Sequence, residues 1–283
     1  MTNLDVARNG NTILLLGGNG KTGRRVSDRL AARNIPVRIG SRSANPAFDW
    51  LNRTTWEGAL EDVAAVYITY YPDLAVPGAA DTIGAFASLA VQNGVRRLVL
   101  LSGRGEEEAQ NAERQLQASG ADWTILRCAW FNQNFSENYL LDDILAGEMV
   151  LPVGGVREPF VDADDIADAA VAALTEDGHV GQLYELTGPR LLTFADAARE
   201  IGIARGKEVR FTEISAEVYA AGLRKAEMPE DWVWLLMELF TKVLDGRNEY
   251  VADGVQRALG RAPRDFSAYA RKAAATGIWG GAK

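Results

Sequence analysis

The sequence predicts an α/β fold, with a parallel sheet flanked by helices and a smaller C-terminal α/β region. Short apolar runs alternate with amphipathic segments through the first half of the chain, which is typical of strand–helix units in a parallel sheet. A glycine-rich stretch separates the first apolar run from the first amphipathic segment. The pattern changes after about Val150. We therefore expect one domain over residues 1–150 and a smaller, interleaved region over 151–283.

The N-terminal elements follow from this alternation. The apolar runs Ile13–Leu16 and Leu98–Leu101 are continuous, which suits strands that are covered on both faces. The predicted strands are Thr12–Leu16, Val37–Ile39, Ala65–Thr69, Arg97–Leu101 and Trp123–Leu126. The predicted helices lie around Lys21–Arg33, Thr82–Asn93 and Glu106–Ser119.

The C-terminal elements carry recognisable helix starts. Thr193 with Asp196 three residues later resembles a capping box, and Ser215 is expected to cap a later helix. A further helix from Pro229 to about Gly246 carries Trp232–Met237, an apolar run that predicts burial on every side against core, a second subunit or a bound ligand. The other predicted elements are the helices Asp162–Leu174 and Phe194–Ile201 and the strand Val209–Glu213.

Composition excludes several functions. The chain has 283 residues with 30 basic and 38 acidic side chains, a net charge of -8 that opposes nucleic-acid binding. Its one cysteine, Cys128, cannot form an internal disulfide, and with one histidine, His179, we expect no metal site. No apolar stretch is long enough for a membrane span and the start is polar, so we expect a cytoplasmic protein acting on a small molecule.

The glycine-rich stretch has the spacing of a phosphate-binding loop. Gly17 permits a tight turn after the first strand, Gly20 lets the backbone approach a pyrophosphate, and Gly23 lets the next helix pack closely. The start of that helix would face the anion. The pattern predicts a dinucleotide site of the Rossmann type. Its remaining expected contacts are Asn19, Lys21 and Thr22.

The end of the second strand selects between dinucleotides. An NAD site usually has Asp or Glu there, bonded to the ribose 2′-hydroxyl. Here Val37–Ile39 leads into Ser41 and Arg42, and the first carboxylate is Asp49. A guanidinium and hydroxyls suit a 2′-phosphate, so we predict NADP(H). The alternative interpretation of Arg42 is a solvated surface arginine.

The chain resembles the NmrA-like branch of atypical short-chain dehydrogenases/reductases. The resemblance spans nearly the whole chain and implies a Rossmann-type fold. It is carried by the glycine loop and by Asn93–Ser102, Ala118–Arg127, Pro159–Ala167 and Tyr184–Pro189. Within the branch, Gly17–Thr22 with Phe48–Trp50 is similar to the festuclavine/agroclavine dehydrogenases, which are NADPH-dependent iminium reductases. The branch also contains quinone and dye reductases and redox-sensing regulators.

One departure from the wider family limits the chemistry. Short-chain dehydrogenases place Tyr-x-x-x-Lys after the strand corresponding to Arg97–Leu101, and these two positions here hold Gly105 and Ala109. Ser102 does match the family's active-site serine. Without the Tyr/Lys pair, alcohol–ketone exchange has no evident proton donor. Reduction of an iminium ion, which accepts hydride alone, fits best, and a quinone or dye cation is compatible.

The resemblance also implies further site residues. Thr69 and Tyr70 should line the cofactor ribose, and Ser102 should lie near the nicotinamide. The residues implied or expected to face the substrate are Trp130, Phe131, Asn134, Trp232 and Phe240. For the aromatic C-terminal helix the alternative is local core or a homodimer interface.

Other polar residues have plainer interpretations. Asp162, Asp164 and Asp165 are expected to complement a helix start, Glu106 to lie in a solvated first turn, and His179 in a surface turn. The resulting hypothesis is an NADPH-dependent imine- or quinone-type reductase of small hydrophobic electrophiles. The alternative is a non-catalytic NADP(H)-binding redox sensor that acts through a protein partner.

Overall fold

The computed structural model describes residues 11–280 and contains a parallel six-stranded sheet with the order β2-β1-β3-β4-β5-β8. Its strands are β1 (Thr12–Leu16), β2 (Val37–Gly40), β3 (Val63–Ile68), β4 (Arg97–Gly103), β5 (Asp122–Cys128) and β8 (Gln182–Leu186). The chain runs from β1 outward to β2 and then returns to the other side of β1. The order in which strands are added therefore reverses between β1 and β3, and ligands of such sheets bind at this switch point.

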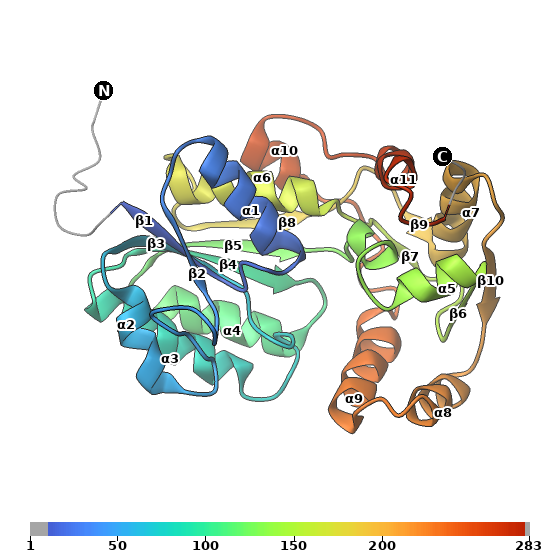
Figure 1. Ribbon diagram of the computed structural model, residues 1–283, viewed down its shortest axis with the longest axis horizontal. Coiled ribbons are helices and arrows are strands. Elements are labelled where there is room, and N and C mark those ends of the chain that lie inside the picture. Colours follow the sequence, from blue (N-terminus) through green and yellow to red (C-terminus); the bar gives the residue numbers. More distant parts are fainter. Residues whose placement is uncertain (1–10, 281–283) are drawn as a thin grey trace. The chain divides into compact units, whose positions relative to one another are not determined.

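Helices cover both faces of this sheet, as Figure 1 shows. One face carries α1 (Lys21–Ala32), α6 (Ala163–Thr175) and α10 (Gly254–Leu259). The other carries α2 (Trp56–Leu60), α3 (Ala79–Gln92) and α4 (Glu107–Ala118). Burial on both sides explains why the central strands are continuously apolar.

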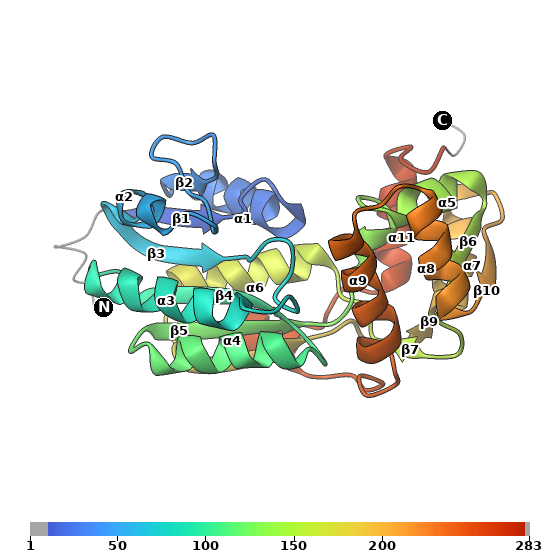
Figure 2. The ribbon, with the colours of Figure 1, turned by 90° about the horizontal axis from the view of Figure 1, so that it is seen from below.

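The remaining elements form two small sheets and a set of helices. Strands β6 (Glu148–Leu151) and β10 (Arg210–Glu213) pair in parallel, and β7 (Arg157–Glu158) pairs antiparallel with β9 (Leu192–Thr193). The helices are α5 (Leu140–Ala146), α7 (Phe194–Arg205), α8 (Ala216–Lys225), α9 (Glu230–Glu238) and α11 (Phe266–Ala275). A π-helical turn, Leu239–Val243, continues α9, and α8 packs beside α9 (Figure 2).

The chain divides into two compact units, each built from three segments. Unit 1 comprises 1–128, 163–186 and 253–261, and unit 2 comprises 129–162, 187–252 and 262–283. The first crossing therefore comes at the end of β5 rather than near residue 150. The later segments return to unit 1 because α6, β8 and α10 complete the layers of the large sheet. Among residues 11–280, no helix is long and apolar enough to cross a membrane.

Most predicted elements form close to their expected positions. The capping box is confirmed, because Thr193 Oγ1 accepts from Asp196 N while Asp196 accepts from Thr193 N. Ser215 caps α8 as predicted. Within the single chain, Trp232 is 38% and Trp234 42% exposed, so the core of this chain does not cover the apolar run on every side. Val233, one residue away, is buried because the helical period turns its side chain inward.

Candidate functional site

The glycine loop follows β1 at the carboxyl edge of the sheet in unit 1. Gly17 has φ +72°, a left-handed conformation that favours glycine, and a Cβ there would lie 2.1 Å from Thr69 Oγ1. A Cβ on Gly23 would lie 2.3 Å from the carbonyl oxygen of Gly17. The turn is closed by Gly20 N–H, which donates to Gly17 O over 2.9 Å. The glycines at 17 and 23 are thus required by close approach.

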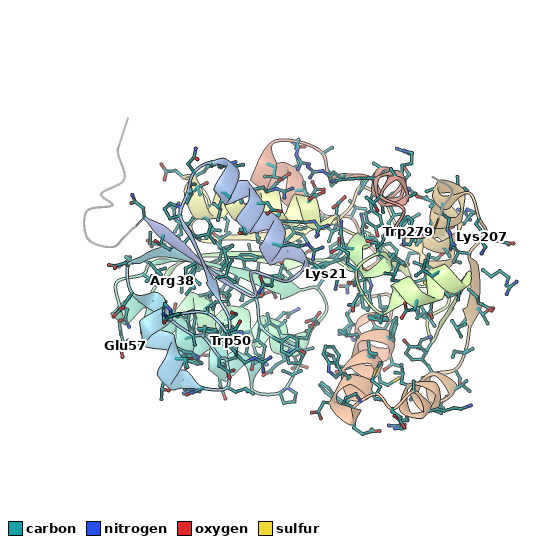
Figure 3. All side chains as sticks on the ribbon, viewed as in Figure 1. Lys21, Arg38, Trp50, Glu57, Lys207 and Trp279 are labelled. Carbon is teal, nitrogen blue, oxygen red and sulfur yellow. The ribbon has the colours of Figure 1, made fainter. Side chains whose placement is uncertain are left out.

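The start of α1 has the features of an anion site. Its N-cap is Gly20, which supplies no side-chain cap, and the first turn contains no acidic residue. The backbone N–H groups of a helix start need acceptors, and the helix dipole favours a negative one. Lys21, the first residue of α1 (Figure 3), adds a positive charge, while Thr22 is buried and Asn19 is exposed. This cradle fits a pyrophosphate.

The segment after β2 carries a cationic turn. Arg42 is exposed and makes no hydrogen bond or ion pair within residues 11–280, and the hydroxyls of Ser41 and Ser43 lie 3.4 Å apart. Arg38, on β2, is instead held by the carbonyl oxygens of Ala59 and Glu61 at 2.9 and 2.6 Å. Of these two arginines, only Arg42 leaves its guanidinium available to a ligand.

The end of β3 is fixed by an aromatic side chain. Trp50 donates from Nε1 to the carbonyl oxygen of Thr69 over 3.2 Å, and its ring lies 5.1 Å from that of Tyr70. Thr69 Oγ1 in turn donates to Leu16 O over 2.8 Å, which ties the end of β3 to the end of β1. Thr69 therefore lies against the glycine loop.

Ser102 belongs to a buried polar chain near the end of β4. Its hydroxyl donates to Glu113 Oε1 over 2.6 Å, and Glu113 also accepts from Arg127. Arg127 lies 3.2 Å from Glu185 Oε1 and its pKa is raised, chiefly by the hydrogen bond with Glu113. The proton of Ser102 is therefore held by a carboxylate, which leaves the oxygen lone pairs to accept.

The two positions registered on the family's Tyr and Lys hold no acid. Gly105 precedes α4 and has φ +77°, and Ala109 is fully buried in the first turn of α4. Neither residue has a side chain that can donate a proton.

A carboxyl pair near this edge was missed by the sequence analysis. Glu106 was expected in a solvated turn, but its carboxyl packs against Gly103, where a Cβ would lie 2.0 Å from Oε1. It also hydrogen-bonds with Asp73, and burial raises the pKa of both carboxyl groups. The signal was present: Asp73 and Glu106 each closely follow a strand, and parallel strands end at one edge.

Unit 2 brings two of the predicted substrate residues together. The ring centroids of Trp130 and Phe240 lie 5.4 Å apart. Phe131 forms an isolated bridge with Val161, while the solvent-exposed Trp232 lies on α9. Asn134 is half-buried on the turn Asn132–Phe135. Asn132, which the sequence analysis did not single out, is fully buried and its carboxamide has no hydrogen-bond partner within residues 11–280.

The remaining acidic residues form specific contacts. Asp162 accepts from Gln133 Nε2 over 2.8 Å, and Asp165 lies 2.7 Å from Arg261. Asp164 pairs with Arg29 of α1 over 3.0 Å. Besides their predicted role at the start of the helix, these carboxylates therefore form specific ion pairs and hydrogen bonds with other segments.

His179 lies in a more enclosed setting than expected. The sequence predicts a surface turn, but His179 is only 8% exposed and its Nδ1 lies 2.9 Å from the hydroxyl of Tyr184. Burial lowers the pKa of this imidazole. The surface interpretation is wrong because Tyr184, on β8, lies beside the turn.

Comparisons with known proteins show the family and the fold of this chain. Residues 17–177 match the NAD(P)H-binding family. Festuclavine synthase II of Penicillium roqueforti (strain FM164) is 31% identical, with 90% of this chain and 96% of that protein covered. The NADPH complex of an Escherichia coli NADPH-dependent quinone oxidoreductase superposes with a TM-score of 0.74 at 21% identity, covering 92% and 99%. Citrobacter sp. triphenylmethane reductase with NADP(H) gives 0.72 at 19%, covering 93% and 99%.

Proposed function

This chain belongs to the NAD(P)H-binding family, as an NmrA-like oxidoreductase, and we propose that it transfers hydride from NADPH to a small hydrophobic electrophile of the iminium or quinone type. The observation that carries this proposal is the start of α1. Its glycine cradle, an N-cap residue without a capping side chain and an acid-free first turn suit a pyrophosphate.

The cofactor contacts come from unit 1. Gly17–Gly23 holds the pyrophosphate, including Asn19, Lys21 and Thr22 within that loop. Ser41 and Arg42 bind the 2′-phosphate, and the available guanidinium of Arg42 supports this role. Thr69 and Tyr70 line the ribose. The hydrogen bonds of Thr69 with Trp50 and Leu16, and the packing of Tyr70 against Trp50, support these roles.

The proposed class of acceptor follows from Ser102 and from the absence of a proton-donating side chain at positions 105 and 109. When bound, the reduced nicotinamide supplies the hydride. Ser102 lies at the nicotinamide end as the catalytic candidate and, because its proton is held by Glu113, offers an accepting oxygen. Gly105 and Ala109 supply no acid, which favours acceptors that need no tyrosine proton. The proposed acceptor contacts are Trp130, Phe131, Asn134, Trp232 and Phe240.

The test is NADPH oxidation followed at 340 nm with a cyclic iminium, a naphthoquinone and a triphenylmethane dye. We expect turnover with at least one acceptor and NADPH preferred over NADH. Gly23→Ala should abolish it, because the added Cβ meets the Gly17 carbonyl, whereas Gly222→Ala, a helical glycine with no atom within 4 Å of its Cβ position, should not. No turnover with any acceptor, together with a dinucleotide affinity that follows oxidation state, would support the redox sensor instead.

A further inference from the structure

One side of α1 carries an arginine every four residues: Arg25 and Arg29 lie within the helix, and Arg33 is its C-cap. Residues four apart lie on one face of a helix, so these side chains share a face. That face meets α6, which packs beside α1 on the same side of the large sheet (Figure 1). The acidic partners of the three arginines follow in the same order along the chain: Asp164, Asp168 and Glu176. We call these three ion pairs the α1–α6 ladder.

The ladder is most buried at the end where α1 begins. The side chains of Arg25 and Asp164 are 17% and 13% exposed, and those of the middle pair are 26% and 25% exposed. At the far end, Arg33 and Glu176 are 49% and 54% exposed. Exposed ion pairs contribute little, because solvent screens them, whereas partly buried pairs are screened less. The pair at the start of α1 is therefore the one suited to hold this helix in place.

This first pair also contacts the backbone of the first turn. A helical side chain tilts toward the N-terminus of its helix. Accordingly, Arg25 Nη1 donates to the carbonyl oxygen of Lys21, the first residue of α1, over 2.7 Å. Nε of the same guanidinium lies 3.3 Å from Asp164 Oδ1, which also accepts from Arg29 Nη2 over 3.0 Å. One guanidinium thus ties the first turn of α1 to α6.

Helix α6 is itself anchored in unit 1. Arg261, which follows α10, lies 2.7 Å from the fully buried Asp165 and 2.6 Å from Asp168. The contacts from Arg261 to Arg25 join three guanidinium groups to three carboxylates, so the charges of these six groups cancel. The network therefore provides a fixed position for α1 rather than a net electric field.

We propose that the ion pair between Asp164 and Arg25 positions the first turn of α1 for the pyrophosphate of a dinucleotide. The two side chains act through the backbone of Lys21, as positioning residues. Hydrogen bonds to an anion weaken steeply when the donor is misaligned, so a displaced first turn would bind less tightly. The proposal rests on the proposed function, which places the pyrophosphate at this helix start. It predicts an effect common to NADPH, NADP⁺, NADH and NAD⁺, because all four contain the pyrophosphate.

Asp164→Ala separates positioning from simple electrostatics. If only the field mattered, removing a negative charge near an anion site would tighten binding. Loss of the tie to α6 should instead raise the Kd of all four dinucleotides by about fivefold or more in a tryptophan-fluorescence titration, with the NADPH-to-NADH ratio unchanged. Glu176→Ala is the matched control, because it removes the acidic partner of another arginine of the ladder, at the exposed end. It should leave all four Kd values within about twofold of the unmodified chain.

Arg25→Lys is the second variant and does not depend on the folding of Asp164→Ala. Lysine keeps the positive charge but lacks the planar fork that contacts Lys21 and Asp164 together. The Kd of all four dinucleotides should rise in this variant as well. Full retention of affinity would mean that the charge alone suffices, and would overturn the positioning role.

Hydrogen exchange without any dinucleotide tests the first turn directly. The Arg24 amide donates to Gly20 O over 3.1 Å, and its exchange should be faster in Asp164→Ala but not in Glu176→Ala. Tighter dinucleotide binding by Asp164→Ala, equal effects of these two variants, or a lower Tm with unchanged exchange and unchanged Kd would each overturn the proposal. If the exchange responds as expected while the unmodified chain binds no dinucleotide, the proposed function is rejected and the positioning of this turn by Asp164 stands.

Discussion

Arg42→Gln tests whether the turn after β2 recognises a 2′-phosphate. The substitution removes the positive charge but keeps a polar side chain of similar length. Arg42 is exposed and makes no hydrogen bond or ion pair within residues 11–280, so the fold should lose no contact. Any change in affinity would then come from the ligand.

The expected size follows from the exposure of the guanidinium. Two unit charges about 4 Å apart attract by about 1 kcal/mol in water-like surroundings. A phosphate monoester carries about -1.5 to -2 charges, so the contact with Arg42 is worth about 1.5–2 kcal/mol. That energy corresponds to about a 10- to 30-fold rise in the Kd of NADPH. The Kd of NADH, which has no 2′-phosphate, should stay within about twofold.

Tryptophan-fluorescence titration with NADPH, NADP⁺, NADH and NAD⁺ measures all four affinities under one condition. The unmodified chain should prefer both phosphorylated cofactors, and the preference should shrink in 1 M salt, where the screening length falls to about 3 Å. Arg42→Gln should remove most of the preference. An equal loss of affinity for NADPH and NADH, or no change in the affinity for either, would refute recognition of the 2′-phosphate by Arg42.

Further predictions concern the carboxyl edge of the sheet. Gly23→Ala should weaken all four dinucleotides at least tenfold in the same titration, whereas Gly222→Ala should leave them unchanged; equal behaviour of the two variants would contradict the close-approach argument. Burial raises the pKa of Glu106 in the folded state above its ordinary value of 4.5. As the pH rises above 4.5, the unfolded chain loses this proton more readily than the folded chain, and the free energy of unfolding therefore falls. Glu106→Gln should therefore raise the free energy of unfolding by about 1 kcal/mol at pH 8 and not at pH 4, measured by urea denaturation; a loss at pH 8 would contradict this. Glu113→Leu should destabilise the fold by about 3 kcal/mol in the same assay, since it leaves the Arg127 charge partly buried without its main partner, and a change under 1 kcal/mol would count against that network.

The cofactor half of the site could be predicted from sequence because it is built from consecutive residues. A phosphate loop needs glycines at fixed offsets. At Gly17 and Gly23 a Cβ atom would clash with Thr69 and with the Gly17 carbonyl, so the residue type alone indicates these close approaches. The absence of a carboxylate after β2 is equally local. The apolar runs located the strands for the same reason, since the apolar side chains of each run indicate that this segment is buried.

The polar contacts around that loop could not be derived in the same way. Glu106 begins a run of three glutamates, which by itself is typical of a solvated helix start. Its actual partner, Asp73, follows a different strand, and their contact depends on β3 and β4 being neighbours in the sheet. His179 was misjudged for the same reason, because its burial depends on Tyr184 across the turn.

Buried polar groups that lack a partner lie beyond sequence reasoning for a stricter physical reason. Trp130 and Phe240 were singled out as aromatic residues, but their sequence positions do not tell whether the Trp130 indole N–H finds an acceptor. Trp130 and Trp279 are the same residue type with the same N–H, and only the fold satisfies the second and not the first. An unsatisfied group is a property of all its neighbours together, so no local pattern can contain it. For this chain, the glycine loop is therefore encoded by spacing along the backbone, whereas the satisfaction of a buried donor depends on contacts between distant side chains.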